Sequence, residues 1–385
     1  MSLRSATERA RITSALFAIV MIGVMVGGTG VLLPAQMDDF SVDKTTIGTM
    51  FFAFSGGYVI TASANGALLH WLGVRWHLVA GAGVAAIAAL GHVLPSSFVA
   101  VLALQALLGV GMGVLDAGLN SYLSTLERGA WLLNLYHAFF GLGALAGPLL
   151  AAYLLDRGLS WRAFFAVLAA GFVIDLLAFL FYPRGCANGA QTRPSLVSAL
   201  RLRVVIIVAA FLCVYVGIEA SVGNWGFSFL TEERGQGVLA AGWVISAYWL
   251  GIALGRLFVN VAAERIGMGV VTLFMICIAV VAVAALVIWA VPSIAVSSVG
   301  LAVLGFFLGP VFPTTIAIVP RLVPAELVST VIGVLAAMSL IGAAALPWAV
   351  GASAQRVGLW LLLPWTTACS VLLGLMWWRI ARRLR

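Results

Sequence analysis

The chain has 385 residues, of which 63% are hydrophobic and only 9% are charged. A soluble globular domain carries about 25% charged residues, so this composition excludes a soluble protein and indicates an integral membrane protein surrounded by the lipid bilayer. The formal net charge of +8 would suit a nucleic-acid-binding protein, but the basic residues are spread over the connections between apolar segments. We therefore expect no nucleic-acid partner.

Twelve apolar stretches are long enough to cross a bilayer core of about 30 Å, which predicts an all-α fold. The first stretch follows a basic segment, residues 1–11, without a small-residue cleavage site, so we expect a retained helix and not a signal peptide. The stretches cover residues 12–34, 46–69, 76–94, 98–125, 130–155, 160–182, 204–230, 238–262, 269–291, 294–319, 326–354 and 358–379.

One long polar connection divides the stretches six and six. The sequence therefore predicts an N-terminal six-helix bundle over residues 1–182, a linker over 183–203 and a C-terminal six-helix bundle over 204–385. Most arginines fall on the side of the termini and the linker, whereas the other side has only Lys44, Arg157, Arg162, Arg234 and Arg356. Because cytoplasmic loops carry the excess of basic residues, both termini and the linker are predicted to be cytoplasmic.

The two halves repeat each other's small residues and prolines at nearly constant offsets. The repeated pairs are Gly143 and Pro148 with Gly342 and Pro347, and Gly109 and Gly113 with Gly305 and Gly309. Parallel six-helix repeats of this kind place a substrate site near the middle of the membrane, where the repeats meet.

Four charged residues interrupt segments that are otherwise apolar: Asp116, Asp175, Glu219 and Arg256. A charge at membrane depth costs about 2.5–3.5 kcal/mol on insertion scales, so such a residue usually faces a cavity or a partner. Asp116 and Asn120 are four residues apart and lie on one helical face. Asp116 is our candidate proton site and Asn120 a substrate ligand; the alternative is a structural acid paired with a neutral donor.

Glu219, midway along the seventh stretch, has several open interpretations. It is a second protonation site, a ligand for the substrate's hydroxyl or amine groups, or the partner of a cation; an inter-helix hydrogen bond is the purely structural alternative. Tyr136 and Tyr215 are candidates for stacking on a substrate ring. Asn134 and His137 are three residues apart on one face, so Asn134 could bind a polar substrate and His137 could relay a proton.

Pro310 and Pro313 are predicted to interrupt the tenth helix at mid-membrane, where freed carbonyls must be buried or face a cavity. Asp175, on the sixth stretch, is expected to pair with a donor at a helix interface. No cluster of residues with metal-ligand spacing, no phosphate-binding loop and no pair of nucleophile and base is present in the sequence, so we expect neither a cofactor nor a metal, and no enzyme activity.

Several segments resemble the major facilitator superfamily over essentially the whole chain. The turn AERIG at residues 263–267 resembles that superfamily's gating turn. Residues 109–120 (GVGMGVLDAGLN), 133–141 (LNLYHAFFG), 215–219 (YVGIE) and 309–313 (GPVFP) resemble its fucose permease-like branch of sugar–proton symporters. The resemblance implies twelve helices in two repeats, and implies that Asp116 takes up the coupling proton and Asn134 binds the sugar.

The same resemblance shows two departures. The branch has an aspartate on the first helix at a position that corresponds to Gly27 here, and Glu219 lies on the symmetry-related seventh helix instead. Arg256, Glu264 and Arg265 resemble an ion-pair latch that gates the cytoplasmic side, with simple anchoring at the membrane surface as the alternative. The corresponding turn of the first half, residues 69–73, has no acid or arginine.

We conclude from the sequence that the chain is a secondary active transporter of a small polar, sugar-like solute, working by alternating access in proton-coupled symport. The alternatives are a proton-coupled exporter of drugs or metabolites, and a non-transporting receptor or scaffold with this fold. Sodium coupling stays open because sodium sites also use carboxylates. We expect a monomer in a bacterial inner membrane; the sequence specifies neither the substrate nor the direction of transport.

Overall fold

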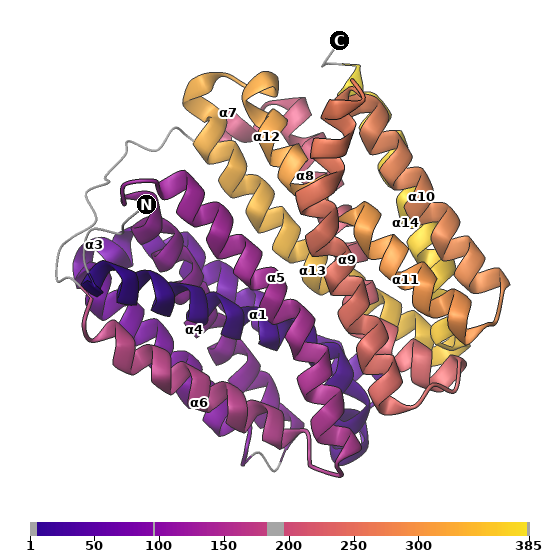
Figure 1. Cartoon of the computed structure of the whole chain (residues 1–385), viewed down its shortest axis with the longest axis horizontal. Helices are drawn as coiled ribbons and strands as arrows, with labels where there is room; N and C mark the ends of the chain where they lie inside the picture. The colour runs from indigo at the N-terminus through magenta and orange to yellow at the C-terminus, as the bar shows by residue number, and fades with distance from the viewer. Residues whose placement is uncertain (1–5, 95–96, 183–195, 383–385) are drawn as a thin grey trace. The chain divides into compact units, whose positions relative to one another are not determined.

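The structure, a computed structural model, describes residues 6–94, 97–182 and 196–382; residues 183–195 of the predicted linker lie outside the described part. The described residues form helices and no strand, so the all-α prediction is confirmed. The helices belong to two compact units (Figure 1). Unit 1 comprises Met1–Ser41 and Phe52–Gln191, and unit 2 comprises Val42–Phe51 and Thr192–Arg385.

Unit 1 is built from long apolar helices packed side by side. Its helices are α1 (Ala6–Phe40), most of α3 (Thr49–Gly91), α4 (Phe98–Ser124), α5 (Gly129–Asp156) and α6 (Arg162–Phe179). The 43-residue α3 is interrupted at Gly73, which has a φ of 70° and a ψ of 163°. Glycine adopts this left-handed φ without strain, so the residue ends one helix and starts the next. The second and third predicted stretches therefore form two helices, as expected.

Unit 2 repeats this plan with one helix divided. Its main helices are α8 (Arg203–Ser228), α9 (Val238–Arg265), α10 (Val270–Ala290), α11 (Ile294–Leu308), α12 (Val311–Leu322), α13 (Val328–Val357) and α14 (Leu362–Ala381). Shorter turns are α2 (Lys44–Ile47), α7 (Leu196–Leu200), η1 (Phe229–Glu233), η2 (Ala325–Leu327) and η3 (Leu359–Leu361). The gap between α11 and α12 falls at Pro310, which confirms the predicted interruption. Pro313 lies in the first turn of α12, where a missing N–H leaves no hydrogen bond unmade.

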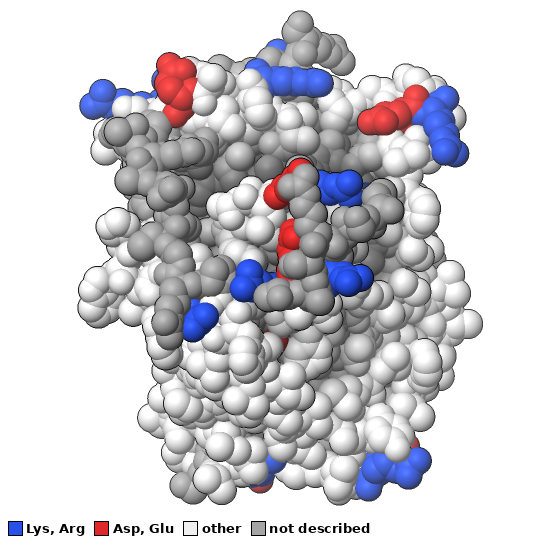
Figure 2. All heavy atoms as spheres, turned by 60° about the vertical axis from the view of Figure 1, so that its left-hand side comes forward, with Lys and Arg blue, Asp and Glu red and all other residues white. Residues whose placement is uncertain are grey.

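Eleven described segments are long and apolar enough to cross a membrane, and the longest of them, Lys44–Gly91, contains the two helices that meet at Gly73. Figure 2 shows charged side chains from the top of the view to somewhat below its middle and again at its lower edge, with an uncharged band between them. Such a band matches a surface that faces lipid.

Repeated glycines bring equivalent helices of each unit into backbone contact. A Cβ on Gly143 would lie 2.2 Å from the carbonyl oxygen of Val20, and a Cβ on Gly342 would lie 1.9 Å from that of Cys213. These contacts join α5 to α1 in unit 1 and α13 to α8 in unit 2. The repeat seen in the sequence is therefore a repeat of close helix packing, which membrane helices achieve with small residues.

The segment before α3 packs with unit 2, although it follows α1 in the chain. The Lys44 ammonium pairs with Glu232 at 2.9 Å, and the Lys44 backbone N–H donates to Gln355 Oε1 at 3.0 Å. A Cβ on Gly48 would lie 3.1 Å from the Trp348 ring. This short segment is therefore held by an ion pair, a hydrogen bond and ring packing.

Candidate functional site

Four polar residues of unit 1 contact one another within predicted membrane spans: Tyr58, Asp116, Asn120 and Tyr136. We call them the Asp116 cluster. Tyr58 donates its hydroxyl hydrogen to Asp116 Oδ2, and Tyr136 donates to Oδ1 at 3.0 Å. The Asn120 amide donates to Oδ1 at 2.9 Å and to the Asp116 carbonyl at 2.8 Å. All three partners are neutral, so a proton can reach or leave this carboxyl without separating an ion pair.

Close packing of α4 against α3 places Tyr58 beside the acid. A Cβ on Gly109 would lie 2.0 Å from the Phe54 carbonyl oxygen, and a Cβ on Gly113 would lie 2.8 Å from that of Tyr58. Because these two glycines lack side chains, the two backbones approach closely, and Asp116 on the next turn of α4 comes within reach of the Tyr58 hydroxyl. Gly109 and Gly113 therefore position the site by permitting this close approach of α3 and α4.

The second polar group, in unit 2, is the Glu219 cluster of Tyr215, Glu219, Tyr248 and Arg256. Glu219 Oε1 pairs with Arg256 Nη2 at 3.3 Å, and Tyr215 donates to Oε2 at 2.6 Å. Tyr248 donates to the Glu219 backbone carbonyl at 2.9 Å. The side chain of Glu219 is 12% exposed and that of Arg256 is 31% exposed. Of the interpretations left open for Glu219, the structure therefore supplies a cation partner.

The break in the tenth span contributes to the Glu219 cluster. Leu308 is the last residue of α11, and its carbonyl accepts a hydrogen bond from the Tyr215 hydroxyl at 2.9 Å. A carbonyl at a helix end inside a membrane needs such a donor. The single hydroxyl hydrogen of Tyr215 thus serves both Glu219 and the interrupted helix.

The structure corrects the predicted surroundings of Arg256. The sequence grouped Arg256 with Glu264 and Arg265 in an ion-pair latch, but Glu264 and Arg265 are exposed near the end of α9 and Arg256 binds Glu219. Eight residues of helix separate Arg256 from Glu264, which is about 12 Å along the axis. The guanidinium therefore points to a different neighbour than the residue spacing indicated.

Two further predicted site residues, the substrate ligand Asn134 and the proton relay His137, lie on α5 outside the Asp116 cluster. Asn134 and His137 are exposed, whereas Tyr136 between them is fully buried. The His137 ring meets the Tyr136 ring edge-on at 5.4 Å. Tyr136 therefore connects the acid to the surface that carries both side chains.

The absence of an acid at Gly27 has a steric reason. A Cβ on Gly27 would lie 2.2 Å from the carbonyl oxygen of Ala144 on α5. No side chain fits there without moving the two helices apart, so an aspartate is excluded by packing.

Two members of the clusters, Tyr58 and Tyr248, are not among the site residues predicted from the sequence. The repeated glycines were the available signal, since Gly305 packs on Tyr248 with a Cβ position 2.2 Å from its carbonyl oxygen, as Gly109 packs on Phe54. Glycine spacing along one helix indicates that another helix approaches closely, but it does not identify the residues of that other helix.

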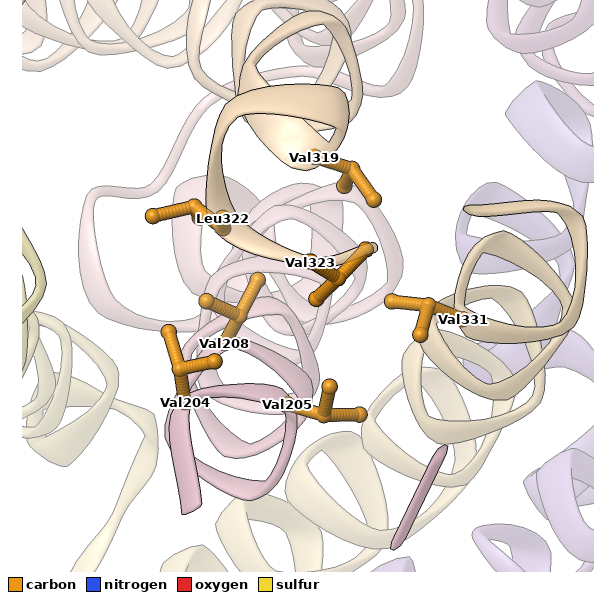
Figure 3. A pocket seen from close by; sticks show the side chains of 7 residues that line it. All are labelled: Val204, Val205, Val208, Val319, Leu322, Val323 and Val331. Atoms are coloured by element: carbon orange, nitrogen blue, oxygen red, sulfur yellow. The ribbon is translucent and has the colours of Figure 1, made fainter. Parts of the chain in front are cut away.

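A third feature of unit 2 is an apolar pocket near the start of α8 (Figure 3). It is lined by Val204, Val205, Val208, Val319, Leu322, Val323 and Val331. The sticks in Figure 3 are all aliphatic, so nothing there can hydrogen-bond a polar solute. Among the described residues, no three His, Cys, Asp or Glu side chains form a group that could hold a metal ion.

Comparisons with known proteins place this arrangement in a family. The Major Facilitator Superfamily profile matches residues 15–235 and 207–384. The chain is 23% identical to the bypass of stop codon protein 6 of Saccharomyces cerevisiae over 91% of this chain and 78% of that protein, and 26% identical to a glucose/galactose transporter of Brucella abortus over 90% and 88%.

A solved structure of a mutant of the nucleoside transporter NupG superimposes with a TM-score of 0.81 at 14% identity, covering 96% of this chain and 99% of that one. At this identity the likeness concerns the fold. Together with the matched profile, it confirms the resemblance inferred from the sequence motifs. The chain is a membrane transporter, not an enzyme, and belongs to the Major Facilitator Superfamily.

Proposed function

We propose that this transporter carries a hexose across the membrane together with a proton, by alternating access. The observation that carries the proposal is the Asp116 cluster: an acid within a predicted membrane span is bound by two tyrosine hydroxyls and an amide, and by no cation among the described residues. The likeness to a glucose/galactose transporter supports the choice of a sugar.

The two clusters divide the work in this proposal. Asp116 takes up and releases the proton, because its hydrogen-bond partners are neutral and no ion pair has to be broken in either step. Glu219 is tied to Arg256, and a proton could reach it only by competing with that pair, so it binds and orients sugar hydroxyls with Tyr215. Asn120 and Asn134 supply further amide donors and acceptors for the sugar. His137 and the gating pair Glu264 and Arg265 stay predictions.

The orientation with both termini in the cytoplasm of a bacterial cell, and the monomeric state, belong to the same proposal. The distribution of arginines over the connections supports the orientation.

Purified protein in liposomes tests the proposal directly. An acidic exterior should drive labelled D-glucose above its equilibrium level, and a protonophore should abolish this accumulation. Asp116→Asn should reduce uptake to equilibrium while sparing glucose exchange at equal pH. The matched control is Asp38→Asn, which removes an exposed acid near the end of α1. Proton-driven accumulation by Asp116→Asn would refute the assignment of the proton site.

The two parts of the proposal fail separately. If a sodium gradient drives accumulation and a pH gradient does not, the coupling ion is wrong. If neither glucose nor galactose is accumulated or exchanged, the substrate class is wrong.

A further inference from the structure

Asp175 on α6 is the third acid within a predicted span, and it differs from Asp116 and Glu219 in its surroundings. The residue is 0% exposed, and neither carboxyl oxygen has a hydrogen-bond partner among the described residues. The sequence led us to expect a donor at a helix interface, and the part of the chain that the structure describes supplies none. A buried carboxyl with both oxygens unsatisfied requires a physical explanation.

Helix packing shows which part of unit 1 surrounds this acid. Gly171 lies one turn before Asp175 on the same face of α6, and Tyr182 follows the end of α6, seven residues after Asp175. A Cβ on Gly171 would lie 2.2 Å from Met21 Cε, and the Tyr182 hydroxyl lies 3.1 Å from Ser14 Oγ. Asp175 therefore faces the part of α1 between residues 14 and 21.

Tyr136 of the Asp116 cluster approaches the same part of α1. On α5, Gly143 packs on Val20 and Gly147 packs on Val24, so the two helices run in the same direction. Tyr136 lies two helical turns before Gly143. Asp175 and Tyr136 therefore lie beside neighbouring turns of α1.

Two basic residues are hydrogen-bonded to Tyr182, Arg75 through its guanidinium and Arg11 through its backbone carbonyl. Arg75 Nε donates to the Tyr182 carbonyl at 2.5 Å, and the Arg11 carbonyl accepts from the Tyr182 hydroxyl at 2.5 Å.

The titratable groups on α3 and α4 are also accounted for. On α3, a His77 ring nitrogen contacts the Val114 carbonyl, and His92 contacts its own helix and stacks on Phe165. On α4, Tyr122 packs on the Tyr182 ring. None of these groups, nor the basic groups near Tyr182, makes a hydrogen bond or ion pair with Asp175.

We propose that Asp175 is a second proton-binding site of unit 1, holding a proton in this conformation and linked to Asp116 through Tyr136. An ionised carboxylate without partners in an apolar interior is far more costly than a neutral carboxyl group. The proton on Asp175 therefore keeps a second negative charge out of the apolar interior of unit 1. The bound proton is independent of the proposed sugar transport; only its part in coupling rests on that function.

Infrared difference spectroscopy of the protein in lipid nanodiscs tests the bound proton without any substrate. Wild-type spectra recorded between acidic and alkaline buffer should contain the carbonyl stretch of a buried, protonated aspartic acid, and Asp175→Asn should lack this band. Asp38→Asn should retain it. A spectrum of Asp175→Asn identical to the wild type would overturn the proposal. If Asp175→Asn does not fold, Asp175→Glu should move the band, and an unmoved band would equally overturn it.

The link to Asp116 has its own measurement. If the two acids are linked as proposed, the Asp175 band of Asp116→Asn should persist at neutral pH and disappear at a lower pH than in the wild type, because the negative charge of Asp116 is gone. An unchanged pH dependence of the band would refute the link. Because this spectrum needs no sugar, a transporter that does not accept glucose would leave the proton site standing.

Discussion

The Asp116 and Glu219 clusters are built on repeated helix packing but use opposite electrostatics. Both combine an acid with tyrosine hydroxyls, and both lie beside helices that glycines bring into backbone contact. In unit 1 the acid is on the fourth span and its partners are neutral. In unit 2 it is on the seventh span and pairs with Arg256. A duplicated scaffold has therefore kept its packing while its polar chemistry diverged.

This difference indicates how a coupled transporter can assign separate tasks to two acids. A carboxyl bound by neutral donors gains or loses a proton at the cost of rearranging hydrogen bonds. A carboxylate paired with a guanidinium must first give up its strongest partner. Substitutions in the two units should accordingly have different consequences.

The largest expected effect follows from removing one member of the ion pair. Glu219→Gln leaves Arg256 without its counter-charge. Breaking a buried pair costs about 3–5 kcal/mol, and because the Arg256 side chain is 31% exposed we expect about 2 kcal/mol in the free energy of unfolding, together with loss of transport. Thermal unfolding in detergent measures the loss.

A double substitution sharpens this contrast. Glu219→Gln combined with Arg256→Gln should be more stable than the sum of the two single variants predicts, since no unpaired charge remains. Strict additivity would mean that the pair is not coupled in solution. Asp116→Asn, whose partners are neutral, should unfold at nearly the wild-type temperature.

The next effect tests whether the packing is equivalent in the two units. Gly143→Ala and Gly342→Ala each place a Cβ about 2 Å from a carbonyl oxygen of the neighbouring helix. Each should lower the free energy of unfolding by about 1–3 kcal/mol. Gly333→Ala, in the same helix as Gly342 but with nothing within 4 Å of its Cβ position, should be neutral or slightly stabilising. Equal effects at all three positions would contradict the packing argument.

A smaller effect separates the donors of the two acids. Tyr58→Phe and Tyr136→Phe each remove one hydrogen bond to Asp116. The loss of about 0.5–1.5 kcal/mol should slow proton-driven uptake by up to about tenfold while sparing glucose exchange at equal pH. Tyr215→Phe, which removes a hydrogen bond to Glu219, should slow exchange as well as uptake. Initial rates of uptake and of exchange measure the difference, and equal losses of exchange in all three variants would contradict the division of tasks.

The smallest effect concerns the segment between α1 and α3. The Asp43 carboxylate accepts the Thr46 N–H at 2.7 Å, and hydrogen bonds from Thr46 lower the pKa of Asp43 below its usual 3.8. The stabilisation is therefore fully present above the unfolded-state pKa and lost as the pH falls through the lower folded-state pKa. Asp43→Ala should cost at most about 1 kcal/mol at neutral pH. The difference in melting temperature between Asp43→Ala and the wild type should shrink below pH 3.8. A constant difference would argue against the role of the Asp43 carboxylate as the N-terminal cap of α2.

Local signals predicted much of the site but not its partners. Apolar stretches predicted the spans, Pro310 predicted the interruption and the charges within apolar segments predicted Asp116 and Glu219. The resemblance of residues 263–267 to a gating turn grouped Arg256 with Glu264 and Arg265, whereas the structure pairs Arg256 with Glu219. The bonds from Tyr58 and Tyr248 could not be predicted, because they depend on the rotation of one helix against another and not on spacing along either.

The sequence by itself determined that the chain spans a membrane, that its halves repeat and that acids lie within apolar helices, because hydropathy, glycine spacing and the cost of buried charge are properties of single segments. Only the tertiary structure decided which acid has neutral partners, which has a cation and which has no partner within the described part of the chain. These contacts join residues on different helices, and they depend on backbone approaches that the glycines permit but do not specify. The steric exclusion of an acid at Gly27 is of the same kind, since it is set by the Ala144 carbonyl of a helix more than a hundred residues away.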